Sequence, residues 1–224
     1  MKTSPIRCEL DHLVVGAQTL NEGASYIADF LGVFPVTGGV HPNMGTHNVL
    51  LALGGSVYLE VIAINPDGDP PEHPRWFSLD NPAVRQTLKE GPQLLTWVAR
   101  TPDISGLKRL EPYAACDVRE MSRGDLRWLF AFTPDGECPG DGLLPHVIEW
   151  RGKAHPTDTL PDSQCRFKGL RANLPPGGRE ATIAAMGLNP IFSGSASEDD
   201  AVGLQAVIER PAAKFFSDEE GLEA

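Results

Sequence analysis

Apolar and polar positions alternate along this chain in two different ways, and each predicts a different element. Residues 57–64 (VYLEVIAI) are apolar on both faces of an extended chain, which predicts a central strand covered on both sides. Residues 8–17 predict another strand. The stretch 19–32 instead repeats its apolar residues at helical spacing, with Thr19 at a capping position and Gly32 as a stop. A strand and an amphipathic helix therefore open the chain.

The order of predicted elements occurs twice. Residues 8–66 read as strand, helix and three strands, and after a proline-rich linker at 67–91 the same order returns in residues 92–152. Residues 165–212 predict a weaker, partial third module, and the acidic stretch 213–224 predicts a tail. The predicted fold class is α+β, built from paired βαβββ modules.

One carboxylate interrupts the apolar strand at 57–64. Glu60 lies in a mostly apolar layer, where an unpartnered charge is costly, so it should be paired, metal-bound, protonated or close to a wet cleft. Aligning the two modules by their strands sets Glu60 against Glu149 and His12 against Thr96. Two glutamates at corresponding positions indicate a shared cleft.

Charge and composition narrow the class of partner. The 19 Lys and Arg against 30 Asp and Glu leave a net charge of -11, which disfavours nucleic acids and anionic membrane surfaces. Neither a signal peptide nor a membrane span is evident, so we expect a cytoplasmic protein with a small-molecule substrate. The cysteines lie far apart, which favours free thiols over a zinc or redox motif.

The motifs and their order resemble the vicinal oxygen chelate superfamily, and within it the glyoxalase-like domain group. Members of the superfamily include glyoxalase I, extradiol dioxygenases, methylmalonyl-CoA epimerase and antibiotic-resistance proteins. The resemblance implies a cupped mixed sheet of the glyoxalase, bleomycin-resistance and dioxygenase type around a cleft. The matching pieces are LDHLVV (10–15), HPNMGTHNVLLAL (41–53), YLEVIA (58–63), LPHVIEW (144–150) and HP (155–156).

The same resemblance implies a divalent metal ion, Zn, Fe, Mn, Ni or Mg, held by the first and last strands of the modules. Carried over by position, the ligands are His12, Glu60 and Glu149, while Thr96 replaces the usual fourth ligand. Either Glu60 or Glu149 could instead serve as a catalytic base. The residues expected to orient substrate are Tyr58, His41, His47, Asn48, Thr96 and Trp97.

The implied function is a metal-dependent enzyme of lyase, isomerase or dioxygenase type that acts on a small oxygenated substrate. The alternative is a non-catalytic binding or resistance protein of the same fold. A structural interpretation also stays open, with His12 a hydrogen-bonded core residue and the glutamates paired with arginines such as Arg127 or Arg151. His155 is either an acid–base group or a helix cap. Relatives often assemble further, so a homodimer is compatible with the pattern.

Overall fold

A computed structural model describes residues 6–174, 179–196 and 203–212. Within these ranges, no helix is both long enough and apolar enough to cross a membrane. The predicted tail at 213–224 lies outside the described residues.

The first module folds in the predicted order. Its helix is capped as expected, because the Thr19 hydroxyl accepts a hydrogen bond from the Glu22 backbone N–H at 3.2 Å and Gly32 ends it with a φ of 75°. Its elements are β1 (Glu9–Gly16), α1 (Leu20–Leu31), β2 (Val36–His41), the 3-10 turn η1 (Pro42–Met44), β3 (Thr46–Ala52) and β4 (Tyr58–Ile64).

The second module has the same strands but no regular helix between the first two. Two 3-10 turns replace it, and the Asp103 side chain caps the first by accepting from the Gly106 N–H at 3.1 Å. A short helix, α2 (Pro82–Thr87), lies in the linker. The module comprises β5 (Gln93–Arg100), η2 (Ile104–Arg109), η3 (Tyr113–Ala115), β6 (Asp117–Arg123), β7 (Leu126–Phe132), η4 (Pro139–Gly142) and β8 (His146–Arg151), with η5 (Pro156–Asp158) after it.

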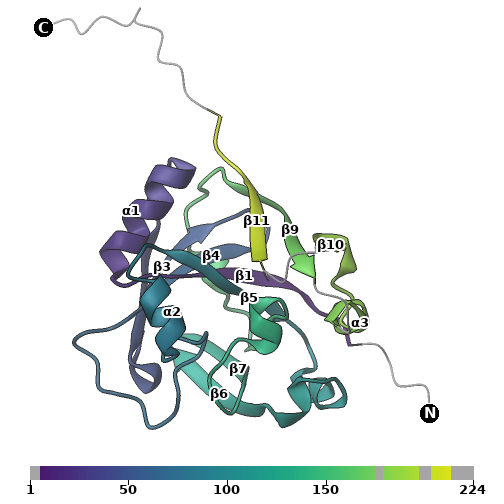
Figure 1. The fold of residues 1–224 in the computed structure, drawn as a ribbon. Helices are drawn as coiled ribbons and strands as arrows, with labels where there is room; N and C mark the ends of the chain where they lie inside the picture. Colours follow the sequence, from purple (N-terminus) through teal and green to yellow (C-terminus); the bar gives the residue numbers. More distant parts are fainter. Residues whose placement is uncertain (1–5, 175–178, 197–202, 213–224) are drawn as a thin grey trace, which may run out of the picture.

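The two modules form one eight-stranded sheet in the order β2-β3-β4-β1-β5-β8-β7-β6. Figure 1 shows the curl of this sheet. Within the modules, β1 runs parallel to β4 and β5 parallel to β8, and the antiparallel β1–β5 pair joins the halves. This mixed, cupped sheet confirms the predicted α+β fold class. Its two edge strands, β2 and β6, approach one another across the cup, so the inner face is enclosed.

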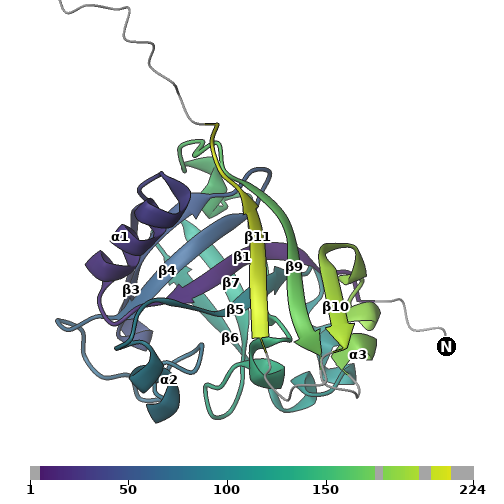
Figure 2. The same cartoon turned by 45° about the horizontal axis from the view of Figure 1, so that its top comes forward.

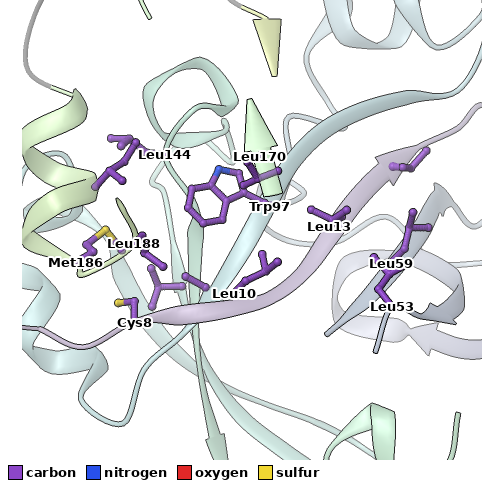
Figure 3. Close-up of a cluster of buried hydrophobic side chains, with 14 of the residues drawn as sticks. Cys8, Leu10, Leu13, Leu53, Leu59, Trp97, Leu144, Leu170, Met186 and Leu188 are labelled. Atoms are coloured by element: carbon purple, nitrogen blue, oxygen red, sulfur yellow. The ribbon is translucent and has the colours of Figure 1, made fainter. Parts of the chain in front are cut away.

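The C-terminal segment covers the outer face of the sheet. It contains β9 (Arg166–Leu174), α3 (Arg179–Ala185), η6 (Asn189–Ile191), β10 (Phe192–Ala196) and β11 (Gly203–Glu209), and its strands form a second sheet in the order β10-β9-β11. Figure 2 shows β11 and β9 crossing over β1 and β5. Trp97, Leu170 and Met186 meet in the buried cluster between the layers (Figure 3). The partial module therefore lies opposite the cleft.

A separate apolar cluster lies on the inner face. It includes Val14, Ile62 and Ile148 from the sheet, and Trp76 and Phe77 from the linker pack against them. The linker thus covers part of the cup, and what remains open on this face forms the candidate site.

Candidate functional site

The inner face of the cup holds a small cavity with a polar side and an aromatic side. Its volume is about 30 Å³, enough to hold a water molecule. The first module contributes His12, His41, Asn48, Tyr58 and Glu60; the linker contributes Trp76 and Phe77; and the second module contributes Arg123, Trp128, Phe130, Ile148 and Trp150.

A fully buried carboxylate, Asp11, anchors the polar side. A register shift in β1 between Leu10 and His12 accompanies its placement, and the Asp11 side chain has no exposed surface. One oxygen lies 2.7 Å from Nδ1 of His12, and the other accepts from the Trp150 indole N–H at 2.8 Å and lies 3.2 Å from Nε2 of His155. Asp11 therefore fixes the orientation of the His12 ring.

His12 and Glu60 face each other at the cavity. Nε2 of His12 lies 3.5 Å from one Glu60 oxygen, and the Asn48 amide donates to the other at 2.5 Å. The Tyr58 ring stacks on His12 with centroids 4.5 Å apart. The separation between His12 and Glu60 exceeds an ideal hydrogen bond, so the direct contact between the two groups is weak.

Arg123 links the two edges of the sheet at this site. From the end of β6, its guanidinium donates to the Asn48 amide oxygen at 3.2 Å and to Nε2 of His41 at 3.0 Å. The other His41 nitrogen, Nδ1, lies 3.2 Å from the Thr46 hydroxyl. A continuous chain of polar contacts thus runs from His41 through Arg123 and Asn48 to Glu60.

Two glycines of β2 make room for this chain. A Cβ on Gly38 would collide with the Asn48 amide oxygen, and a Cβ on Gly39 would lie 2.9 Å from Cδ of Arg123. The close approach of Asn48 and Arg123 to β2 therefore depends on the absence of side chains at these two positions.

Burial and hydrogen bonding oppose each other in setting the pKa values of the central groups. Burial would lower the pKa of His12, but its bonds to Asp11 and Glu60 outweigh burial and raise it to about 9. Burial would raise the pKa of both carboxyls; for Asp11 the His12 and His155 contacts lower it instead, and for Glu60 contact with His12 does so. Near neutral pH the site therefore holds a His12 cation between two carboxylates.

Two further ionisable groups that the first module places at the cavity, His41 and Tyr58, stay neutral. Burial lowers the pKa of His41 to about 4, and the neighbouring Arg123 charge adds to this effect. Burial also raises the pKa of the Tyr58 hydroxyl well above its ordinary value. His41 is therefore a neutral acceptor for Arg123, and Tyr58 keeps its proton.

The structure brings together five of the predicted residues, but Glu149 is not among them. Its carboxylate accepts from the Ile104 backbone N–H at 2.8 Å and pairs with Arg151 at 2.9 Å. On β8 it is Ile148 and Trp150 that line the cavity, and alternation directs Glu149 between them to the opposite face. The predicted set of His12, Glu60 and Glu149 is therefore not assembled, whereas the five that meet are His12, His41, Asn48, Tyr58 and Glu60.

Three other predicted residues also lie away from the described cavity lining. The Thr96 side chain is fully buried, and its hydroxyl donates to the Trp97 carbonyl at 3.4 Å. Trp97 packs in the outer cluster, where its indole N–H donates to the Leu143 carbonyl at 3.1 Å (Figure 3). His47 alternates with Asn48 on β3 and so projects to the opposite face of that strand.

Sequence reasoning did not single out Asp11 or Arg123. Asp11 stands directly beside His12, and that adjacency was an available signal, whereas Arg123 reaches the site only because the sheet curls. His155 is the helix cap that one interpretation favoured. Its ring accepts from the Thr157 backbone N–H at 3.3 Å, and the His155 backbone N–H donates to the Asp158 carboxylate at 2.8 Å. It contacts Asp11 as well.

Comparison with known families decides the assignment. The sequence matches the family described as a glyoxalase-like domain over residues 10–185. The chain belongs to this family. The resemblance to the vicinal oxygen chelate superfamily is thereby confirmed, and the match spans both modules and extends into the C-terminal segment. No curated protein matches the sequence.

Several solved structures are similar to this glyoxalase-like chain. Methylmalonyl-CoA epimerase from Mycobacterium tuberculosis shares 19% identity with a TM-score of 0.40, covering 69% of this chain and 93% of the epimerase. A hypothetical protein from Staphylococcus aureus shares 15% with a TM-score of 0.49, covering 79% and 73%. A Streptomyces coelicolor methylmalonyl-CoA epimerase in complex with 2-nitronate-propionyl-CoA shares 15% with a TM-score of 0.40, covering 67% and 97%.

The metal site implied by the resemblance takes its ligands from the strands of both modules. In this glyoxalase-like chain the first module supplies His12 and Glu60, but Ile148 and Trp150 line the cavity from the last strand of the second. Neither can act as a ligand, and the Arg123 cation lines the same cavity. Among the described residues, no group of three or more His, Cys, Asp or Glu is placed to hold a metal. The donor set does not fit a divalent ion.

Proposed function

We propose that this glyoxalase-like protein is an enzyme that transfers a proton on a small oxygenated substrate, in an isomerase or lyase type of reaction. One observation carries the proposal: an acid and a base, His12 and Glu60, lie 3.5 Å apart at a cavity although both are buried. Buried opposite charges of this kind are typical of acid–base sites.

Each polar group then has a role in the reaction. Glu60 takes the proton from a carbon next to a substrate carbonyl. The electron pair of the broken C–H bond forms a carbon–carbon double bond, and the π pair of the carbonyl moves onto its oxygen. The N–H of protonated His12 donates to that oxygen and stabilises its developing charge. Return of the proton to carbon, or loss of a leaving group from the neighbouring carbon, completes the isomerase or lyase reaction. Asp11 and Asn48 hold the two reacting side chains in place.

Substrate binding would itself strengthen the base. In the free protein the contact with His12 lowers the pKa of Glu60, which makes it a weak base. A substrate oxygen that takes over the His12 N–H removes this contact, so the pKa of Glu60 rises when the substrate is in place. At 3.5 Å the contact between the two groups is longer than a normal hydrogen bond, so little is lost when the His12 N–H turns to the substrate oxygen.

A metal-dependent reaction is the version that the family resemblance implies, with His12 and Glu60 among the ligands of an ion of Zn, Fe, Mn, Ni or Mg. Because a third protein ligand is not placed among the described residues, the proposed reaction relies on the His12 cation in place of a Lewis acid. Lewis-acid catalysis would need the same oxygen to bind a metal instead.

The test is hydrogen–deuterium exchange at carbon. Purified protein, with and without prior treatment by a chelator, is incubated in D₂O with a panel of α-hydroxyketones, α-ketoaldehyde thiol adducts and acyl thioesters, and NMR follows the loss of the C–H signal. We expect exchange on at least one compound, and a loss of about 100-fold or more in Glu60→Gln and in His12→Gln. Glu149→Gln is the matched control, because that carboxylate lies on the other face.

Two results would contradict the proposal. One is exchange that survives in Glu60→Gln. The other is exchange that disappears with the chelator and returns with a divalent ion, accompanied by metal-induced thermal stabilisation that His12→Gln abolishes. The aromatic wall of the cavity favours a second candidate, non-catalytic binding of a planar molecule, for which a compound would bind tightly without any exchange.

A further inference from the structure

Buried nitrogens without a hydrogen-bond partner occur in the linker and on the strand of the second module that Phe77 contacts. Among the described residues they are Nε of Arg75, Nε1 of Trp76 and both ring nitrogens of His146. His146 is 1% exposed, with the edge of Phe77 at 4.9 Å and the face of Phe130 at 5.6 Å between ring centroids. A buried histidine with neither nitrogen satisfied calls for an explanation, since such groups are rare in native proteins.

Phe77 separates the small cavity from a much larger hollow. The larger hollow has a volume of about 770 Å³ and is lined by Ser78, Leu95 and Cys138, among others. Within the described part of the chain, Phe77 is the one residue that lines both spaces. Phe77 and Ser78 also adopt φ values of 59° and 57°, a strained conformation for residues other than glycine. Movement of Phe77 would join the two spaces.

His146 lies in one row with the reacting groups. His12 on β1 pairs with Val98 on β5, and Val98 pairs with His146 on β8. Two strand spacings therefore separate the two histidines, about 10 Å across the inner face. The apolar Val98 side chain lies between them in this row.

We propose that His146 is a substrate-binding residue that Phe77 uncovers when it swings aside, and that the substrate is a flat molecule with a polar group at each end. One end carries an oxygen that meets His12 and Arg123, and the other carries a hydroxyl that meets His146, about 10 Å away. This inference rests on the proposed function for the position of the His12 end. Burial keeps the His146 ring neutral, so it can accept from or donate to a hydroxyl.

The experiment compares two probes that differ by one hydroxyl. 4-Hydroxycinnamate has a carboxylate and a hydroxyl at opposite ends of a flat frame, and cinnamate lacks the hydroxyl. Calorimetric Kd values are measured for both probes with the wild-type protein, with His146→Leu and with His146→Gln. His47→Leu is the matched control, since it makes the same change on the opposite face of β3. Thermal unfolding shows that each variant is folded.

We expect removal of the probe hydroxyl to weaken binding to the wild-type protein at least tenfold, because the site would then leave His146 unpaired. The same removal should have no effect in His146→Leu and an intermediate effect in His146→Gln. His146→Leu should also raise the melting temperature, since it replaces an unpaired buried polar group by an apolar one. This combination of weaker binding and higher stability is not expected of a purely structural histidine.

A wild-type protein that binds neither probe, or that binds both equally, would overturn the inference. So would a hydroxyl effect of the same size in the wild type and in His146→Leu. Glu60→Gln separates this inference from the proposed function. If Glu60→Gln binds the probe in a way that depends on His146, the inference stands. If the wild type catalyses no exchange on any compound, the proposed reaction is wrong, whatever the result for probe binding.

Discussion

The two modules share an order of strands but present different chemistry to the same cavity. The first places His12, Asn48 and Glu60 on its inner face, whereas β7 and β8 of the second place mainly aromatic rings and an isoleucine there. A doubled fold therefore need not have a doubled site. In this protein the first module supplies His12 and Glu60, and the second supplies Arg123 and most of the apolar wall beside them.

The second module nevertheless supports the polar side through two N–H donors. Trp150 donates to Asp11, and Arg123 donates to Asn48 and His41. Both donors come from residues whose other atoms line the cavity. The difference between the modules is thus a division of roles across a shared network, and three experiments probe how complete it is.

The largest expected effect comes from comparing one buried carboxylate of each module. Asp11→Asn removes a fully buried charge that faces His12, and we expect it to lower the free energy of unfolding by about 3 kcal/mol. Glu149→Gln keeps an oxygen that can accept from the Ile104 N–H, and it should cost less than about 1 kcal/mol. Urea denaturation of both variants measures the difference. Equal losses would show that the charges of the two modules are equally important.

The second comparison concerns the dependence of stability on pH. It takes one histidine from each module, because the pKa of one is raised and the pKa of the other is lowered. The pKa of His12 is raised to about 9. Its contribution to the free energy of unfolding, on the order of 1–3 kcal/mol, is therefore full below about pH 6.5 and is lost as the pH rises through 9. The pKa of His146 is lowered to about 3, so stability is lost as the pH falls below about 6.5.

Stability measured against pH in two variants tests these signs. His12→Gln should flatten the curve between pH 6.5 and 9, where Asp11, Glu60 and Tyr58 face the imidazole. His146→Leu should remove part of the loss of stability that occurs below about pH 6.5. An unchanged alkaline limb in His12→Gln would mean that His12 is not protonated in the folded protein.

The smallest expected effect concerns the donor that crosses between the modules. Trp150→Phe keeps an aromatic ring but removes the N–H that Asp11 accepts, and it should cost about 1–2 kcal/mol. Trp128→Phe is the matched control, because Trp128 packs against Trp150 with ring centroids 5.6 Å apart and is not bonded to Asp11. Similar losses in thermal unfolding experiments would assign the effect to ring size instead of the hydrogen bond.

The sequence predicted the fold well because its signals are local and repeated. The capping of α1 by Thr19, its stop at Gly32 and the strands of both modules could be read from short stretches. A strand apolar on both faces, however, does not reveal which of its faces meets the cleft. Matching the glutamate of VIEW to that of YLEV therefore put Glu149 one residue away from the positions that face inward.

The rest of the site depends on long-range geometry. Arg123 is 75 residues from Asn48 in the chain and reaches it only because the edges of the sheet approach each other. Asp11 was visible beside His12, but a strand that alternates regularly would direct the two side chains apart. The register shift between Leu10 and His12 accompanies the exception, and short patterns do not predict such a shift.

Gly38 and Gly39 carry no chemistry, yet two side chains of the polar network lie where their own would have to be. A library of random single substitutions should therefore tolerate change poorly at these positions, even where the new residue is small and neutral. In the evolution of this family such glycines would constrain the site as strictly as its charged residues do. Residues that take part in no hydrogen bond of the polar network would then be as necessary to it as the residues that form it.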